Sequence, residues 1–133
     1  MSNATTTGNI YSPDYPRNYG NFANCTYVVR VPPVKRTAIR VQFTDFAVEA
    51  DYDFLYYGAG ETPDLAQALG QLDGQGLPED LAVAGDAMWF WFVSDFSVTF
   101  GGFALTWDGT GWLGIQFRVE GRLIDCLIDK LLS

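Results

Sequence analysis

Four carboxylates lie within one short segment of the chain, and their spacing could bind a cation. They are Asp45, Glu49, Asp51 and Asp53. Two carboxylates about 4 Å apart repel each other by about 4 kcal/mol at an effective dielectric constant of about 20. A folded protein therefore either leaves such groups spread apart in water or neutralises them with a cation. The segment alone leaves both arrangements open.

The composition excludes several kinds of site. The 133 residues contain no histidine, which excludes histidine-dependent triads and the usual His-rich zinc sites. Sixteen acidic residues against 8 basic ones give a net charge of −8. This charge argues against nucleic acid and favours a metal ion or a cationic partner. A glycosidase built on paired carboxylates needs a deep aromatic cleft, which nothing in so short a chain forms, so we expect no enzyme.

The elements that must position these carboxylates are predicted to be strands. Residues 37–43 alternate between apolar and polar side chains, which is typical of a half-buried strand. The aromatic-rich residues 54–57 follow the acidic segment and end at a glycine turn. Turn residues separate further predicted strands at 8–11, 25–31, 81–83, 88–93 and 103–107. Short strands at this spacing predict one all-β domain, a sandwich or a barrel. The longest apolar run, residues 87–93, is too short to span a bilayer.

The order of several motifs resembles a CUB domain, an extracellular antiparallel β-sandwich module of jelly-roll type. The resemblance covers about residues 8–107. The motifs are GNIYSPDYPRNY at 8–19, the single Cys25 followed by Tyr27 and Val29, VPP at 31–33, VQFTDF at 41–46, YDFL at 52–55, FVSD at 92–95 and Gly102-Phe103. We therefore expect residues 8–107 to form the sandwich and residues 108–133 to form a C-terminal extension.

The resemblance implies a calcium site, because many CUB domains bind calcium. Carried over residue by residue, the acidic ligands fall on Glu49, Asp53 and Asp95. A main-chain carbonyl near Ser97 would complete the cage, and Tyr19 would brace a carboxylate. The acidic loop is shorter than usual, so that Asp51 or Asp45 is an alternative to Glu49. CUB domains of this type dock a lysine or arginine of a protein partner beside the calcium ion, so Tyr19 and the three carboxylates are also the expected partner-binding residues.

The cysteines depart from the usual CUB pattern of two disulfides. The first cysteine is missing from the N-terminus, and the inner pair is replaced by Ala50 and Asp73. The remaining two, Cys25 and Cys126, could form one disulfide, although neither their count nor their pattern requires it. The first residues lack a basic start and an apolar core, so we expect no secretory signal peptide within this chain. The triplets at Asn3 and Asn24 are candidates for N-glycosylation and favour an extracellular location.

The C-terminal extension has its own pattern. Residues 113–119 alternate as a strand would, and apolar residues between 123 and 132 recur at helical spacing. We expect one more strand and a short amphipathic helix. Such a helix is unstable alone. We therefore expect residues 113–132 to self-associate or to dock on a partner, and truncation after Trp107 to leave the sandwich folded.

Three functions fit these observations. The first is a calcium-dependent protein-binding module that recognises a lysine or arginine. The second is a carbohydrate-binding module, in which Tyr11, Tyr15 and Tyr19 would stack on sugars, although loop packing is the simpler role for these rings. The third is a structural subunit of a larger assembly, docked through its C-terminal tail. Binding that requires calcium favours the first of these.

Overall fold

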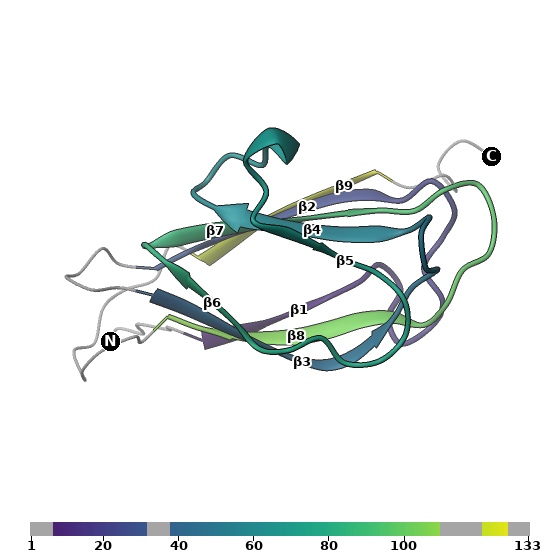
Figure 1. The fold of residues 1–133 in the computed structure, drawn as a ribbon, viewed down its shortest axis with the longest axis horizontal. Helices are drawn as coiled ribbons and strands as arrows, with labels where there is room; N and C mark the ends of the chain where they lie inside the picture. The colour runs from purple at the N-terminus through teal and green to yellow at the C-terminus, as the bar shows by residue number, and fades with distance from the viewer. Residues whose placement is uncertain (1–6, 32–37, 110–120, 128–133) are drawn as a thin grey trace.

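The chain folds into two antiparallel sheets that pack face to face (Figure 1). The computed structural model describes residues 7–31 and 38–109 and the backbone of residues 121–127. One sheet has four strands in the order β1 (Thr7–Tyr11), β8 (Gly102–Asp108), β3 (Ala38–Ala47) and β6 (Leu81–Ala84). The other has five in the order β5 (Gly70–Leu72), β4 (Phe54–Ala59), β7 (Ala87–Val93), β2 (Asn24–Arg30) and β9 (Gly121–Leu127). The predicted β-sandwich is confirmed.

The alternation in the sequence decides which side chains fill the space between the sheets. In β3, Ile39, Val41 and Phe43 are buried, while the residues between them are exposed. The central strand β7 is apolar on both faces, and its Met88, Phe90 and Phe92 join the main core. Burying large aliphatic and aromatic side chains on both inner faces is the main stabilisation of such a sandwich.

The register of the strands brings two distant loops to the same end of the sandwich. At the end of β3, Ala47 pairs with Gly102, the first residue of β8. At the start of β4, Phe54 pairs with Val93, the last residue of β7. The loops 48–53 and 94–101 therefore both cross between the sheets at one end, on the right of Figure 1.

Residues 59–79 contain more regular structure than the sequence indicates. The weak apolar patch forms the 3₁₀ helix η1 (Leu65–Gln67), and Gly70–Leu72 form β5 on the edge of the larger sheet. The carboxylate of Asp64 accepts a hydrogen bond from the Ala66 amide, 3.0 Å long, and so caps η1. A three-residue edge strand has too few residues to show a period of two, which explains why it was missed.

The predicted C-terminal helix is wrong over the residues that the structure describes. Residues 121–127 form β9, which pairs antiparallel with β2 along all seven residues, from Asn24 opposite Leu127 to Arg30 opposite Gly121. The open edge of β2 offers unpaired amide and carbonyl groups, and pairing with them outweighs the weak helical preference of a short segment. The predicted strand at 113–119, residues 128–132 of the helix and Asn3 lie outside the described residues.

Candidate metal centre

Three carboxylates from two loops meet at the end of the sandwich. Glu49 and Asp53 come from the loop between β3 and β4, and Asp95 comes from the loop between β7 and β8. One carboxylate oxygen of each residue lies within 4.8 Å of those of the other two. Asp53 is fully buried, whereas Glu49 and Asp95 are half-buried. We call Glu49, Asp53 and Asp95 the acidic cluster.

Asp53 is held by hydrogen bonds from both sides. Its Oδ2 accepts a hydrogen bond of 2.6 Å from the Tyr19 hydroxyl, and its Oδ1 accepts one of 2.9 Å from the Asp95 amide. The same Tyr19 oxygen accepts a hydrogen bond of 3.1 Å from the Glu49 amide. One buried tyrosine thereby contacts two of the three acidic residues and fixes how they lie relative to each other.

The loop that carries Asp95 is joined to residues 18–23. The Phe22 amide donates to the Asp95 carbonyl at 2.9 Å. The Ser94 hydroxyl donates to the Gly20 carbonyl at 2.7 Å and accepts from the Ala23 amide at 2.8 Å. Ser94 was missed as a positioning residue, although its place beside Asp95 was the available signal. These bonds hold Asp95 rigidly opposite Glu49 and Asp53.

The acidic cluster disfavours its own ionisation. Loss of hydration raises the pKa of the Glu49 carboxyl, and the nearby carboxylates of Asp95 and Asp53 raise it further. Burial raises the pKa of Asp53, an effect that outweighs the hydrogen bonds from Tyr19 and Asp95. Burial, followed by the hydrogen bond to Asp53, also raises the pKa of Tyr19. Oε1 of Glu49 is buried without a hydrogen-bond partner among the described residues. A bound cation would satisfy this oxygen and offset the repulsion.

Comparison with known proteins identifies the family. The sequence profile of the CUB domain family matches residues 2–107. The chain belongs to the CUB domain family. CUB domains are extracellular modules of protein–protein interaction and are generally not enzymes. The resemblance in the sequence is therefore confirmed over nearly the whole sandwich.

Relatives of this CUB domain include much longer proteins. Fibropellin-3 of Strongylocentrotus purpuratus is 36% identical over 110 residues, which are 79% of this chain and 19% of that protein. Cubilin of Canis lupus familiaris is 33% identical over 98 residues, 71% of this chain and 3% of that protein. The chain thus spans less than a fifth of either of these relatives.

One solved structure bears directly on the acidic cluster. The MASP-1 CUB2 domain bound to Ca²⁺ superposes with a TM-score of 0.68 and is 26% identical, covering 80% of this chain and 95% of that one. A CUB domain of this fold therefore binds calcium. Among the residues described for the present chain, no helix is long and apolar enough to cross a membrane.

The two alternative carboxylates lie elsewhere in this CUB domain. Oδ2 of Asp45 accepts a hydrogen bond of 2.6 Å from the exposed Tyr15 hydroxyl. Asp51 is exposed, with a φ of 69°, and its amide donates to the Asp73 carboxylate at 2.6 Å. Neither joins the acidic cluster. The Ser97 amide donates to Oδ1 of Asp95 at 3.2 Å, which keeps residue 97 beside the cluster.

Hydrogen bonds join the segments that the inner CUB disulfide usually links. Ala50 and Asp73 stand where the resemblance places that pair of cysteines. Here the Asp73 carboxylate binds the Asp51 amide, and the Val48 amide donates to the Gly74 carbonyl at 3.0 Å. The acidic loop is therefore anchored to residues 73–74 without a covalent link.

The remaining candidates from the sequence lie on β2. Cys25 is buried and disulfide-bonded, and the register of the backbone sets Cys126 directly opposite it. The exposed Asn24 accepts a hydrogen bond of 2.7 Å at Oδ1 from the Trp91 indole nitrogen. The pairing of the two cysteines and the glycosylation of Asn24 stay predictions.

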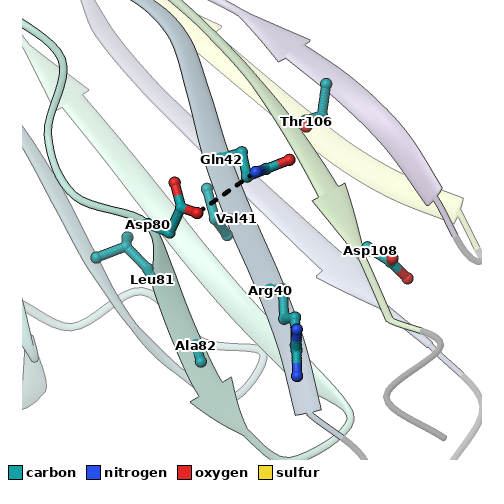
Figure 2. Close-up of a pocket in the computed structure, with 8 residues that line it drawn as sticks. All are labelled: Arg40, Val41, Gln42, Asp80, Leu81, Ala82, Thr106 and Asp108. Carbon is teal, nitrogen blue, oxygen red and sulfur yellow. Dashed lines mark hydrogen bonds between the residues drawn. The ribbon is translucent and has the colours of Figure 1, made fainter.

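A second concave feature lies away from the acidic cluster. A hollow of about 340 Å³ lies over β3, β6 and β8, toward the start of β3 and away from the acidic loop. Figure 2 shows the residues that line it. Within it the Gln42 side-chain amide donates a hydrogen bond of 3.4 Å to Oδ2 of Asp80. None of the described residues that line it is aromatic, and these residues therefore offer no flat stacking surface for a sugar. The lining residues are Arg40, Val41, Gln42, Asp80, Leu81, Ala82, Thr106 and Asp108.

Proposed function

We propose that this CUB domain is a non-enzymatic extracellular binding module that holds one calcium ion and docks a basic side chain of a protein partner beside it. Glu49, Asp53 and Asp95 would ligate the ion, and the main-chain carbonyl of Ser97 would add a neutral ligand. The observation that carries the proposal is the approach of three carboxylate oxygens to within 4.8 Å of one another.

The chemistry of the acidic cluster suits calcium. Calcium takes six to eight oxygen ligands at about 2.3–2.6 Å and tolerates the irregular geometry of loops. The buried Oε1 of Glu49 lacks a hydrogen-bond partner among the described residues. Loss of hydration is the main cause of the raised pKa values of Glu49 and Asp53, and a bound cation would offset this cost. With four protein ligands, water would complete the coordination. We expect the weak affinity of extracellular sites, with a Kd of about 10⁻⁴–10⁻³ M.

The charge of the site suits a lysine or arginine. Three carboxylates around one Ca²⁺ leave one net negative charge, held by oxygens at the surface of the sandwich. An ammonium group can share these oxygens while it stays partly hydrated, so that the desolvation cost remains small. The net charge of −8 would also speed the approach of a basic surface. A single contact of this kind is weak, and useful affinity would need several copies or added contacts.

The structure weakens the sugar-binding alternative. Tyr19 is only 1% exposed and packs edge-on against Phe92, and it therefore has no free face for a sugar. Tyr11 and Tyr15 stack on each other with centroids 5.4 Å apart. Tyr19 is thus packed in the core, and each of the other two rings has one face covered by its neighbour, although Tyr11 is 50% exposed. Docking through residues 113–132 remains a further possibility to test, although β9 pairs with β2 of its own chain.

Binding to an immobilised lysine peptide tests the proposal. We expect the protein to bind in calcium, to be released by chelator, and to bind more weakly as salt increases. Asp95→Asn should abolish binding while the domain stays folded. Asp45→Asn is the matched control, because it removes the same charge from an exposed carboxylate outside the acidic cluster. Equal binding with and without calcium would contradict the proposal.

A further inference from the structure

Four exposed apolar residues lie in the loops that carry and adjoin the acidic cluster. Phe22, Tyr52, Phe96 and Val98 are 52%, 61%, 68% and 52% exposed. Tyr52 precedes Asp53 in the chain, Phe96 follows Asp95, and Val98 follows Ser97. The Phe22 amide binds the Asp95 carbonyl at 2.9 Å. These four residues, which we call the apolar rim, thus come from all three loops around the cluster.

Two residues of the apolar rim have an unfavourable backbone conformation. Phe22 and Val98 have φ values of 54° and 60°. Positive φ is unfavourable for a residue with a side chain, and most unfavourable for a β-branched one such as valine. Hydrogen bonds between residues 18–23 and 94–100 nevertheless hold the two loops that carry these residues together. Large apolar side chains held in water at the loop tips indicate a surface that becomes covered on binding.

A basic side chain between apolar neighbours matches this surface. The alkyl stem of a lysine can pack along aromatic rings while its ammonium group reaches the carboxylates. Phe and Tyr rings also attract a cation over their faces. Apolar groups around a polar contact exclude water and strengthen the contact that they surround. The apolar rim would therefore add affinity that a bare acidic site lacks.

We propose that the apolar rim selects partners in which the docking lysine or arginine is flanked by apolar residues. This inference rests on the proposed function, because it assigns the residues that must lie on either side of the basic group. A lipid surface is the less favoured occupant. The net charge of −8 opposes approach to anionic membranes.

Two immobilised peptides, Gly-Leu-Lys-Phe-Gly and Gly-Ser-Lys-Ser-Gly, test the inference in calcium and in chelator. We expect the apolar-flanked peptide to bind at least tenfold more tightly in calcium. The double variant Phe22→Asn/Phe96→Ser should lose this preference, and asparagine tolerates the positive φ at position 22. Phe96→Ser alone serves if the double variant does not fold. The calcium-induced rise in Tm reports that the metal site is intact in either variant.

The control variant Leu65→Ser/Leu69→Ser removes two side chains that are 48% and 58% exposed, at and just beyond η1 and away from the cluster. It should keep the full preference. Equal calcium-dependent binding of both peptides, or a preference that survives in the rim variant, overturns the inference and leaves the proposed function standing. If neither peptide binds in calcium, both fail. A third result would also overturn the inference and would assign the rim to lipid. In that case the protein shows no peptide preference but binds phosphatidylserine vesicles in calcium, and the rim variant loses this binding.

Discussion

The hydroxyl of Tyr19 lies 2.6 Å from Oδ2 of Asp53, and both side chains are almost fully buried. The same hydroxyl accepts a hydrogen bond of 3.1 Å from the Glu49 amide, and the Tyr19 ring packs on Phe92 of the core. The most buried carboxylate of the acidic cluster is therefore oriented by a residue of the hydrophobic core. The Tyr19 side chain therefore contributes both to the stability of the sandwich and to the geometry of the candidate site.

Tyr19→Phe should destabilise the protein by about 1–3 kcal/mol, because it removes the hydrogen bonds that the Tyr19 hydroxyl makes with Oδ2 of the buried Asp53 and with the Glu49 amide. The matched control is Tyr15→Phe, which removes another 2.6 Å bond from a tyrosine to a carboxylate, here the exposed Asp45. Water can replace that bond, so the loss should stay below about 1 kcal/mol. Denaturant unfolding of both variants measures the difference, and equal losses would contradict it.

Glu49→Gln should stabilise the calcium-free protein near neutral pH. The pKa of Glu49 is raised above its ordinary value of 4.5, and hence the folded state binds its proton more tightly than the unfolded state does. This proton-linked stability is present at low pH and is lost as the pH rises through the raised pKa. Glutamine removes the titration.

The Tm of Glu49→Gln in chelator should therefore exceed that of the wild type near pH 7, and the difference should shrink as the pH falls toward about 4.5. In calcium the order at neutral pH should reverse, because the variant loses a ligand. A difference in Tm that does not change with pH would show that Glu49 has no raised pKa.

Much of the fold could be predicted from the sequence, because alternation is a direct consequence of burying one face of a strand. Residues 37–43 show this pattern, and residues 38–43 lie in β3, which extends to Ala47. The β5 strand and η1 were missed, since they are too short to have a period. The helix predicted over 123–132 is wrong over its described residues, 123–127, because their conformation is decided by pairing with the edge of β2. That pairing cannot be seen in their own sequence.

The candidate site was predictable in part. The family resemblance pointed to Glu49, Asp53 and Asp95, and their carboxylates lie together. The contribution of Ser94 was missed because it depends on loops that meet only in the folded chain. The apolar rim was also missed, since exposed and buried phenylalanines look alike in sequence.

Asn24 should carry an N-linked glycan when the protein passes through a eukaryotic secretory pathway. Its side chain is exposed and held by the Trp91 indole, 2.7 Å from Oδ1, which leaves the amide nitrogen available. Asn24→Asp keeps an oxygen that accepts the hydrogen bond from Trp91 but removes the amide nitrogen to which the glycan would be attached. Intact-mass measurement should show the glycan on the wild type and its loss in the variant. An unchanged glycan mass in the variant would show that the glycan is attached to another residue.

Cys25 and Cys126 should form a disulfide that fastens β9 to β2. Cys25 is disulfide-bonded, and Cys126 is opposite it in the register. A closed loop of about 100 residues would stabilise the fold by up to about 4.7 kcal/mol in the chain-entropy model. Peptide mapping without reduction should recover the two cysteines in one linked fragment. If the disulfide is the main contribution of the two cysteines to stability, Cys126→Ser should lower the free energy of unfolding as much as Cys25→Ala does. Two free thiols in the native protein would contradict the pairing.

The central claim, a calcium site at Glu49, Asp53 and Asp95, is tested most directly by the Tm in calcium and in chelator. At a calcium concentration tenfold above Kd, binding should stabilise the wild type by about 1.4 kcal/mol, which corresponds to a rise in Tm of about 5 °C. Asp45→Asn should show the same rise, and Asp95→Asn should show none. A wild-type Tm that calcium leaves unchanged, or an equal rise in Asp95→Asn, would contradict the claim.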